Sequence, residues 1–185
     1  SEIVVQKFGG TSVGTVDRID SVAEIIKNAS KSNQIVVVVS AMGGETNRLV
    51  DLAKTFGDDP DKREFDALVS TGETVSSALL TMALHSKGIK AKSFSASQIS
   101  MRTTSSYSKA KILDVDAKKI LDVIDSDTIP IITGFQGVTE GGDVTTLGRG
   151  GSDTTAVAIA AQIDAVRCDI YTDVDGIFTT DPGVV

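Results

Sequence analysis

Short runs of apolar, mostly β-branched residues alternate along this chain with longer stretches in which apolar residues recur every three or four positions. Residues 35–39 form the clearest run, an uninterrupted series of Ile and Val. The lack of polar alternation there is typical of a strand that is covered on both faces of a parallel sheet. Residues 16–29 show the second pattern, which predicts an amphipathic helix.

The two patterns together predict the order of the secondary-structure elements. We expect strands at 3–8, 35–39, 90–94, 129–133 and 165–171, helices at 16–29, 46–56, 62–70, 73–87, 117–124 and 154–163, and a turn-rich β segment at 136–147. Gly88 is expected to end the helix before it. Because strands and helices alternate and no linker divides the chain, the sequence predicts one α/β sandwich with a mainly parallel sheet.

Composition narrows the class of protein. The 185 residues are 41% hydrophobic and 23% charged, which is typical of a globular domain. The formal net charge is -7 and no basic run occurs, so nucleic acid is not an expected partner. No apolar run reaches the roughly 18 to 20 residues that span a bilayer, so we expect no membrane partner either.

Cysteine and histidine each occur once. Cys168 has no second cysteine with which to form an internal disulfide, and this favours a reducing compartment, the cytoplasm. His85 lies near the expected end of a helix, where a solvated side chain is ordinary. A Ser-His-Asp hydrolase or a histidine-rich metal site would have to be built around it, and both are disfavoured.

Polar, glycine-rich segments follow several of the predicted strands, and ligands of open α/β sheets collect at the carboxyl ends of strands. In the first segment Lys7 precedes Gly9 and Gly10, and residues without Cβ let backbone amides approach an anion just before a helix. The spacing matches neither the P-loop nor the dinucleotide fingerprint. The segment is either a phosphate-binding loop or an ordinary turn with a solvated lysine.

Two further segments carry similar alternatives. Ser40 opens a glycine-bearing turn after the most apolar strand, and this turn is either a second anion loop or only a tight turn. Glu73 lies near the expected start of a helix. Its carboxylate either serves a ligand or stabilises the positive end of the helix.

The segment around Arg149 is the most informative. This arginine lies among three glycines, so the loop can fold tightly around a carboxylate or phosphate that the guanidinium clamps. Ser152 or Asp153 is expected to cap the helix that follows. The acidic segment 171–182 either holds a nucleotide with its Mg²⁺ or forms a series of Asx turns.

Taken in order, these segments resemble the signatures of the aspartokinases. The strings are Lys-Phe-Gly-Gly-Thr-Ser-Val, Ser-Ala-Met-Gly, Ser-Thr-Gly-Glu, Gly-Phe-Gln-Gly, Leu-Gly-Arg-Gly-Gly-Ser-Asp-Thr-Thr-Ala and Tyr-Thr-Asp-Val-Asp-Gly-Ile-Phe-Thr-Thr-Asp-Pro. Each is weak alone, but together they cover nearly the whole chain in the order of that family. Carbamate, acetylglutamate and uridylate kinases share the fold and the first glycine pair, whereas Arg-Gly-Gly-Ser-Asp and Ser-Thr-Gly-Glu resemble the aspartate-specific branch.

The resemblance implies a three-layer αβα sandwich of the amino acid kinase fold. Residues 1–185 would form one catalytic domain, with an aspartate-binding N-terminal lobe and the beginning of a nucleotide-binding lobe. Intact relatives continue into the rest of that lobe and into regulatory domains, so we expect a chain that is truncated at its C-terminus. Gly183 stands where the family usually has arginine, which weakens the expectation of a basic phosphate contact there.

The resemblance also implies a role for each matched residue. The catalytic residues would be Lys7, Gly9, Gly10, Ser40 and Asp153. The substrate-binding residues would be Thr46, Glu73, Phe135, Arg149 and Ser152, with the glutamate receiving the substrate ammonium and the arginine its α-carboxylate. The nucleotide-binding residues would be Lys7, Thr172, Asp173 and Phe178. No direct protein ligand to a metal is expected, since Mg²⁺ would be bound mainly through the ATP phosphates.

The implied activity is that of an aspartate kinase. It would transfer the γ-phosphoryl group of ATP to the side-chain carboxylate of L-aspartate, giving 4-phospho-L-aspartate for lysine, threonine and methionine biosynthesis, in an enzyme whose intact form is a homodimer. An aspartate carboxyl has a pKa of about 4 and is already a nucleophile at neutral pH, so no general base is needed. The reaction needs in-line positioning and neutralisation of two anions, which Lys7, Mg²⁺ and loop amides can supply. The alternative is a truncated, non-catalytic lobe that binds aspartate or nucleotide, or self-associates, without turnover.

Overall fold

The computed structural model describes residues 1–172 and 177–181 and contains a large and a small sheet. The large sheet has six strands in the order β10-β9-β1-β2-β6-β3. Its strands are β1 (Ile3–Phe8), β2 (Gln34–Val39), β3 (Ala91–Phe94), β6 (Ile129–Thr133), β9 (Arg167–Tyr171) and β10 (Ile177–Thr180). All neighbouring strands are parallel except β9 and β10. The prediction of a mainly parallel sheet is confirmed.

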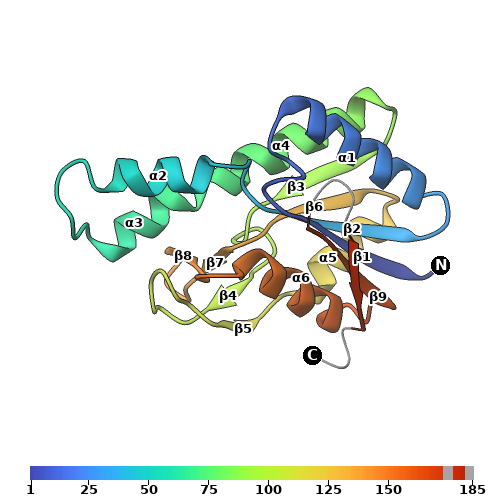
Figure 1. The fold of residues 1–185 in the computed structure, drawn as a ribbon. Helices are drawn as coiled ribbons and strands as arrows, with labels where there is room; N and C mark the ends of the chain where they lie inside the picture. The colour runs from blue at the N-terminus through green and yellow to red at the C-terminus, as the bar shows by residue number, and fades with distance from the viewer. Residues whose placement is uncertain (173–176, 182–185) are drawn as a thin grey trace.

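Helices cover both faces of this sheet (Figure 1). On one face lie α1 (Val16–Ala29) and α4 (Thr71–Ser86), and on the other lie α5 (Ala117–Asp125) and α6 (Gly151–Gln162). Strand β2 contributes to both cores because its side chains alternate between the faces. Val37 and Val39 pack on the side of α1 and α4, whereas Val36 and Val38 pack on the side of α5 and α6. The three-layer αβα arrangement is confirmed.

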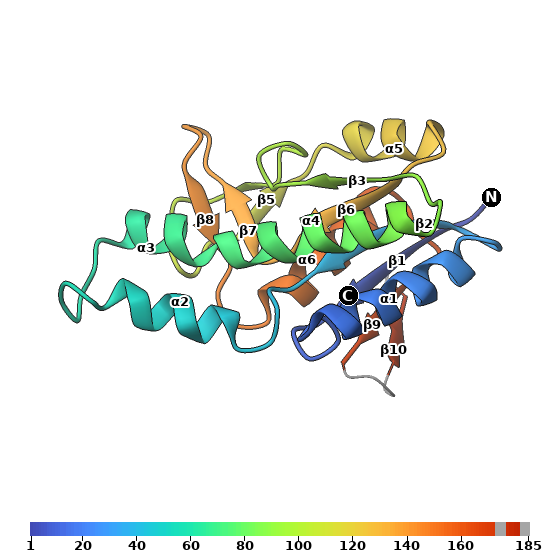
Figure 2. The same cartoon turned by 90° about the horizontal axis from the view of Figure 1, so that it is seen from above.

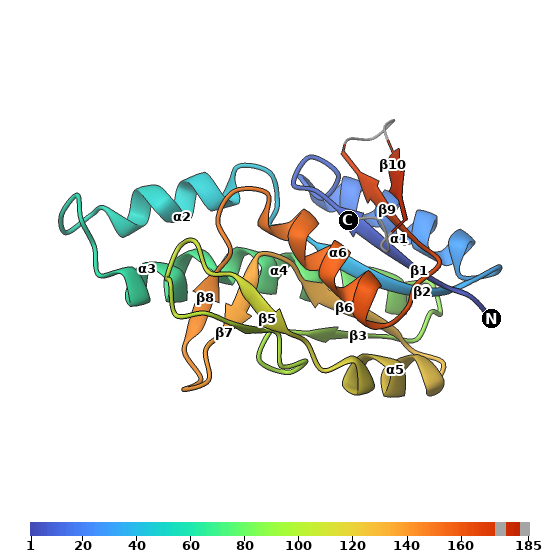
Figure 3. The ribbon, with the colours of Figure 1, turned by 90° about the horizontal axis from the view of Figure 1, so that it is seen from below.

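The small sheet has four strands in the order β5-β4-β7-β8 and packs against α3 (Lys62–Val69), as Figure 3 shows. Its strands are β4 (Arg102–Thr103), β5 (Ile112–Asp114), β7 (Gln136–Val138) and β8 (Val144–Thr146). The turn-rich segment at 136–147 was predicted as β structure, and β7 and β8 confirm it. The sequence did not predict β4 and β5, because strands of two or three residues are too short to show an alternating pattern.

A helical hairpin of α2 (Glu45–Ala53) and α3 extends away from the large sheet (Figure 2). Helix α3 runs on through Ser70 into α4. The joined stretch, Lys62–Ser86, is long and apolar enough to cross a membrane by length and composition, but half of its most apolar window is buried inside the fold. Core helices of soluble proteins meet the same criterion, so the stretch is weak evidence for a membrane span.

Several boundaries differ from the sequence predictions, and one difference affects the site. Helix α6 begins at Gly151, three residues earlier than expected, with Gly150 as its N-cap in a left-handed conformation (φ 72°). The prediction that Ser152 or Asp153 caps this helix is therefore wrong. A glycine adopts positive φ at little cost, so the helix starts earlier and both polar side chains lie in its first turn.

The other helix and strand shifts are small. Helix α4 spans Thr71–Ser86 where 73–87 was expected, α2 ends at Ala53 and not at 56, and β9 begins at Arg167 and not at 165. Gly88 has φ 77° and follows the end of α4, with its N–H bonded to the carbonyl of His85. This is the role expected for a glycine just past a helix end.

Candidate active site

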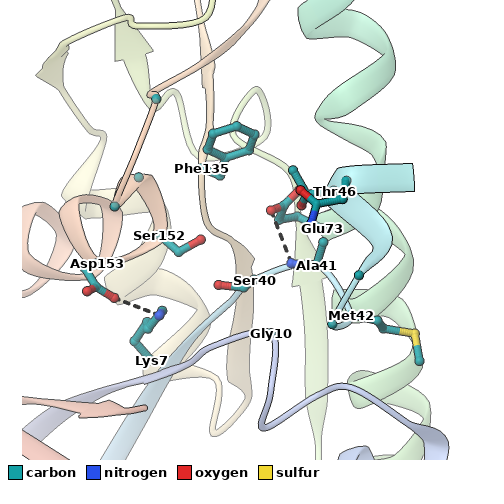
Figure 4. A pocket seen from close by; sticks show the side chains of 16 residues that line it. Lys7, Gly10, Ser40, Ala41, Met42, Thr46, Glu73, Phe135, Ser152 and Asp153 are labelled. Carbon is teal, nitrogen blue, oxygen red and sulfur yellow. Dashed lines mark hydrogen bonds and ion pairs between the residues drawn. The ribbon is translucent and has the colours of Figure 1, made fainter. Parts of the chain in front are cut away.

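A cavity of about 340 Å³ opens where β1 and β2 end, between α4 and the first turn of α6 (Figure 4). Several segments far apart in the sequence meet there. The lining residues are Lys7, Gly10, Ser40, Ala41, Met42, Gly43, Gly44, Thr46, Asn47, Glu73, Phe135, Gly148, Gly150, Gly151, Ser152 and Asp153. The cavity therefore lies at the carboxyl ends of parallel strands, where an open α/β sheet is expected to bind ligands.

Lys7 and Asp153 form an ion pair at one side of the cavity. Their Nζ and Oδ1 atoms are 2.7 Å apart, and the side chain of Lys7 is 11% exposed whereas that of Asp153 is 49% exposed. Lys7 is the penultimate residue of strand β1, just before the glycine pair, and a Cβ at Gly9 would lie 3.2 Å from its Nζ. Lys7 lines the cavity, so an anionic group that enters it can compete with Asp153 for the ammonium.

The two glycine-bearing loops after β1 and β2 lie against each other. A Cβ at Gly10 would lie 3.2 Å from the carbonyl oxygen of Ala41, and a Cβ at Gly43 would lie 3.2 Å from the carbonyl oxygen of Gly10. Side chains at these positions would push the loops apart. Their glycines therefore bring the backbone of both loops, together with Ser40, to the floor of one cavity.

Glu73 lies on the opposite side of the cavity from Lys7, with Ser40 and Ser152 between them (Figure 4). It is 2% exposed, and its Oε2 accepts a hydrogen bond from the N–H of Ala41 at 3.2 Å. Its Oε1 is buried and has no hydrogen-bond partner among the residues that the structure describes. Burial raises the pKa of Glu73 to about 8, although backbone amides of Glu73 and Ala41 offset part of the effect. An incoming cation would supply the missing partner.

The predicted substrate residues fall into two groups. Thr46, Glu73, Phe135 and Ser152 all line the cavity. Arg149 is exposed and is not a lining residue, although Gly148 and Gly150 on either side of it are. The structure therefore brings the loop of Arg149 to the cavity and leaves its guanidinium in solvent.

Two of the predicted nucleotide residues, Thr172 and Phe178, lie in or next to β9 and β10, at one edge of the large sheet. Thr172 directly follows β9 and is exposed. Phe178 is in β10, where its backbone pairs with that of Ile170. Asp173 and Gly183 lie outside the described residues. Of the predicted nucleotide residues, only Lys7 lines the cavity in the described part of the chain.

Three buried polar residues that sequence reasoning missed hold the walls of the cavity, namely Asp66, Gln136 and Thr155. The amide of Gln136 donates to the carbonyl of Ser70 at 2.6 Å and accepts from the hydroxyl of Thr133 at 2.8 Å, so it ties the start of α4 to β6. The only signal for Gln136 and Thr155 was their place inside the Gly-Phe-Gln-Gly and Ser-Asp-Thr-Thr strings. No sequence pattern marked Asp66.

Comparisons with known proteins agree with this geometry. The profile of the amino acid kinase family matches residues 2–185. An aspartate kinase of Stutzerimonas stutzeri and an aspartokinase of Geobacillus stearothermophilus are each 56% identical to this chain over 99% of its length and 45% of theirs. The chain thus spans about half the length of the curated relatives that it matches.

Solved structures give the same picture. Aspartokinase III of E. coli, crystallised with lysine and aspartate, superimposes with a TM-score of 0.85 at 32% identity, covering all of this chain and 52% of that one. Aspartate kinase from Synechocystis has a TM-score of 0.79 at 47% identity, covering all of this chain and 30% of that one. With the family profile matched along nearly its whole length, the chain belongs to the amino acid kinase family.

Proposed function

We propose that this chain is the catalytic part of an aspartate kinase, which transfers the γ-phosphoryl group of ATP to the side-chain carboxylate of L-aspartate. The observation that carries the proposal is a carboxyl group, Glu73, and an ammonium group, Lys7, held apart in one cavity. The incompletely partnered carboxylate of Glu73 suits the substrate ammonium, and the ammonium of Lys7 suits a phosphate. The names of the relatives support the same substrate.

The residues divide the work of the reaction between the two sides of the cavity. Glu73 holds the α-ammonium of aspartate, while Arg149 turns inward from its exposed loop to bind the α-carboxylate through two parallel hydrogen bonds. Phe135, Thr46 and Ser152 line the space between them. This arrangement would direct the side-chain carboxylate of the substrate toward Lys7.

The chemical step then needs no base from the protein. A carboxylate oxygen of aspartate attacks the γ-phosphorus, the bond from that phosphorus to the β,γ-bridging oxygen breaks, and ADP leaves with the electron pair. Lys7 exchanges its contact with Asp153 for the transferred group and stabilises the charge that develops on its oxygens. The amides of the loops around Gly10 and Ser40 supply further donors from the floor of the cavity.

ATP would enter with Mg²⁺ as part of this proposal. In residues 1–172 and 177–181, no three His, Cys, Asp or Glu side chains gather as a metal site. The magnesium ion would be carried by the phosphates, where it neutralises part of their charge. Thr172, Asp173 and Phe178 are assigned to the nucleotide side. We further propose that the intact enzyme is a cytoplasmic homodimer. It would act in lysine, threonine and methionine biosynthesis.

The test is an ADP-release assay with and without L-aspartate, run beside calorimetry with aspartate alone. We expect ADP release that depends on aspartate and a measurable heat of aspartate binding. Binding of aspartate without turnover would favour the alternative of a non-catalytic lobe. The proposed function would be overturned if the chain neither binds aspartate nor releases ADP in response to it.

A further inference from the structure

The turn that carries Phe135 has a backbone conformation that a non-glycine residue rarely adopts. Phe135 has φ 71°, and the N–H of Gln136 donates to the carbonyl of Gly134 at 2.7 Å, closing a turn of only three residues. Turns of this kind with positive φ are rare and strained. Such a residue at a ligand site persists only where its surroundings hold it in place.

Hydrogen bonds from α6 and from the residue after β8 hold the backbone of Phe135. Its N–H donates to Oγ1 of Thr155 at 3.1 Å, and its carbonyl accepts from the N–H of Leu147 at 3.0 Å. The carbonyl bond continues the pairing of β7 with β8, since Phe135 and Leu147 follow the register Gln136↔Thr146. The N–H of Phe135 is held instead by α6, through Thr155.

Thr155 connects this turn to the first turn of α6. It is 0% exposed, and its hydroxyl donates to the carbonyl of Gly151 at 2.9 Å while it accepts from Phe135. One hydroxyl group thus serves as acceptor for the strained turn and as donor to the helix. Valine has the same shape but can do neither.

Close packing transmits any movement of the turn to Ser152. A Cβ at Gly134 would lie 2.6 Å from Oγ of Ser152, and a Cβ at Gly151 would lie 2.8 Å from Cδ1 of Phe135. The turn and the first turn of α6 therefore interlock without room for adjustment. Phe135 and Ser152 both line the cavity, so their positions are set together.

We propose that Thr155 is a positioning residue for the substrate site, which fixes Phe135 in its strained conformation and thereby keeps Phe135 and Ser152 in register. The identity of the ligand, aspartate, rests on the proposed function. The hydrogen bond from Phe135 to Thr155 does not. Amide exchange at Phe135 therefore tests the hydrogen bond to Thr155, and aspartate binding tests the identity of the ligand, in separate measurements.

The experiment compares three variants of this chain. Thr155→Val removes the hydroxyl and keeps the shape, whereas Thr155→Ser keeps the hydroxyl. Thr154→Val is the matched control, since Thr154 is exposed and its hydroxyl donates to the carbonyl of Gly150 at 3.2 Å, away from Phe135. Amide hydrogen exchange at Phe135 and the calorimetric Kd for aspartate are measured for each.

We expect Thr155→Val to speed exchange of the Phe135 amide and to raise the Kd for aspartate, each by about tenfold, because a buried donor loses its acceptor. Thr155→Ser and Thr154→Val should stay within about twofold of the unaltered chain. The proposal is overturned if Thr155→Ser is as impaired as Thr155→Val, which would indicate packing alone. It is also overturned if Thr155→Val leaves both measurements unchanged.

Two further outcomes are decisive. If Thr155→Val does not fold, the unaltered chain still provides the test, because its Phe135 amide must be as protected as the amides of α6, and free exchange there contradicts the proposal. If the unaltered chain neither binds aspartate nor releases ADP in response to it, the proposed function fails. Exchange of the Phe135 amide in the variants then still decides the role of Thr155.

Discussion

Asp66 and Glu73 are buried carboxylates on consecutive helices, but their surroundings differ. Asp66, in α3, is 0% exposed and accepts from the N–H of Thr146 at 2.8 Å, from the hydroxyl of Thr146 at 2.9 Å and from the N–H of Ser108 at 2.9 Å. Glu73, in α4, is nearly as buried, yet one of its oxygens has no partner among the described residues. Because a buried polar group needs partners, Asp66 is complete within the fold, whereas Glu73 keeps one oxygen open toward the cavity.

The difference indicates that Asp66 stabilises the walls of the cavity, whereas Glu73 is available to a ligand. Asp66 fixes Thr146 at the end of β8, directly before the glycine loop of Arg149, and it also fixes the loop at Ser108. The loop at Ser108 in turn touches that glycine loop, since a Cβ at Gly148 would lie 3.2 Å from the carbonyl oxygen of Ser108. Asp66 therefore shapes the cavity from outside, whereas Glu73 lines it and, in the proposed function, contacts the ligand.

The largest effect that this comparison predicts is on stability. Asp66→Ala leaves two buried donors of Thr146 and the partly buried N–H of Ser108 without an acceptor, and should lower the free energy of unfolding by about 4 kcal/mol. Urea unfolding followed by circular dichroism measures it. Asp58→Ala, at an exposed position between α2 and α3, is the matched control and should change the free energy of unfolding by less than about 0.5 kcal/mol. A similarly small change for Asp66→Ala would end the distinction between the two carboxylates.

Lys7 challenges the comparison, because it is buried and already has a partner, Asp153. If the presence of a partner were the only criterion, Lys7 would be a structural residue like Asp66. Its partner is half exposed, however, so the pair can open for a phosphate. Lys7→Ala should lower kcat in the ADP-release assay by roughly 10² while the free energy of unfolding changes by less than about 1 kcal/mol. Near-native turnover of Lys7→Ala would mean that Lys7 is a structural residue. Lys54→Ala, at an exposed lysine, serves as the control.

Residues close in sequence explain what could be predicted without the structure. The β2 run has no polar interruption and both of its faces are buried, so its place in the centre of a parallel sheet followed from the pattern. The glycine loops after β1 and β2 were also predictable as anion-binding candidates, because their residue types limit what the backbone can do. The matched strings then supplied the roles of Lys7 and Glu73.

Partners distant in sequence explain what was missed. Asp66 accepts hydrogen bonds from residues 42 and 80 positions away, and no local pattern marks an aspartate in a helix as a buried anchor. The strain at Phe135 depends in the same way on Thr155, 20 positions later. Residue type predicted an anion-binding role for Arg149, but only the fold shows that its side chain is exposed.

Glu73→Gln sharpens the comparison from the ligand side. The amide keeps the shape and one acceptor oxygen but lacks the charge that attracts an ammonium, so the Kd for aspartate should rise by roughly 30-fold. Stability at pH 7 should change little, in contrast to Asp66→Ala, because the amide carries no charge, like the neutral acid that the free site mostly holds at this pH. Calorimetry with succinate, which lacks the α-amino group, is the control. If succinate is penalised as heavily as aspartate, Glu73 is a scaffold residue.

Arg149 extends the comparison to an exposed group. Its proposed two-pronged contact with the α-carboxylate needs the planar guanidinium, so Arg149→Lys should raise the KM for aspartate by about tenfold and the KM for ATP by less. Arg102→Lys is the control, since Arg102 is an exposed arginine that pairs with Asp114 at 2.6 Å, away from the cavity. A larger rise in the KM for ATP than in the KM for aspartate would place the guanidinium of Arg149 on the nucleotide and not on the substrate.

The smallest predicted effect comes from the pKa of Glu73, which burial raises from 4.5 to about 8. Between these pH values the folded chain binds more protons than the unfolded chain, so the contribution of Glu73 to the free energy of unfolding falls as pH rises through this window and is constant above it. At pH 7 the free site therefore holds mostly the neutral acid. An ammonium favours the carboxylate, so aspartate must displace nearly one proton when it binds.

Two measurements follow from that proton. The affinity for aspartate should increase about fivefold from pH 7 to pH 8, as expected for a pKa near 8, and level off above it. Calorimetry at pH 7 in two buffers with different heats of ionisation should show the release of almost one proton, and Glu73→Gln should abolish it. Asp66→Asn, if it folds, should leave proton release unchanged, because Asp66 does not contact the cavity. An affinity that is independent of pH, with no proton released, would mean that the open oxygen of Glu73 does not receive the ammonium, and the two buried carboxylates would then both belong to the scaffold.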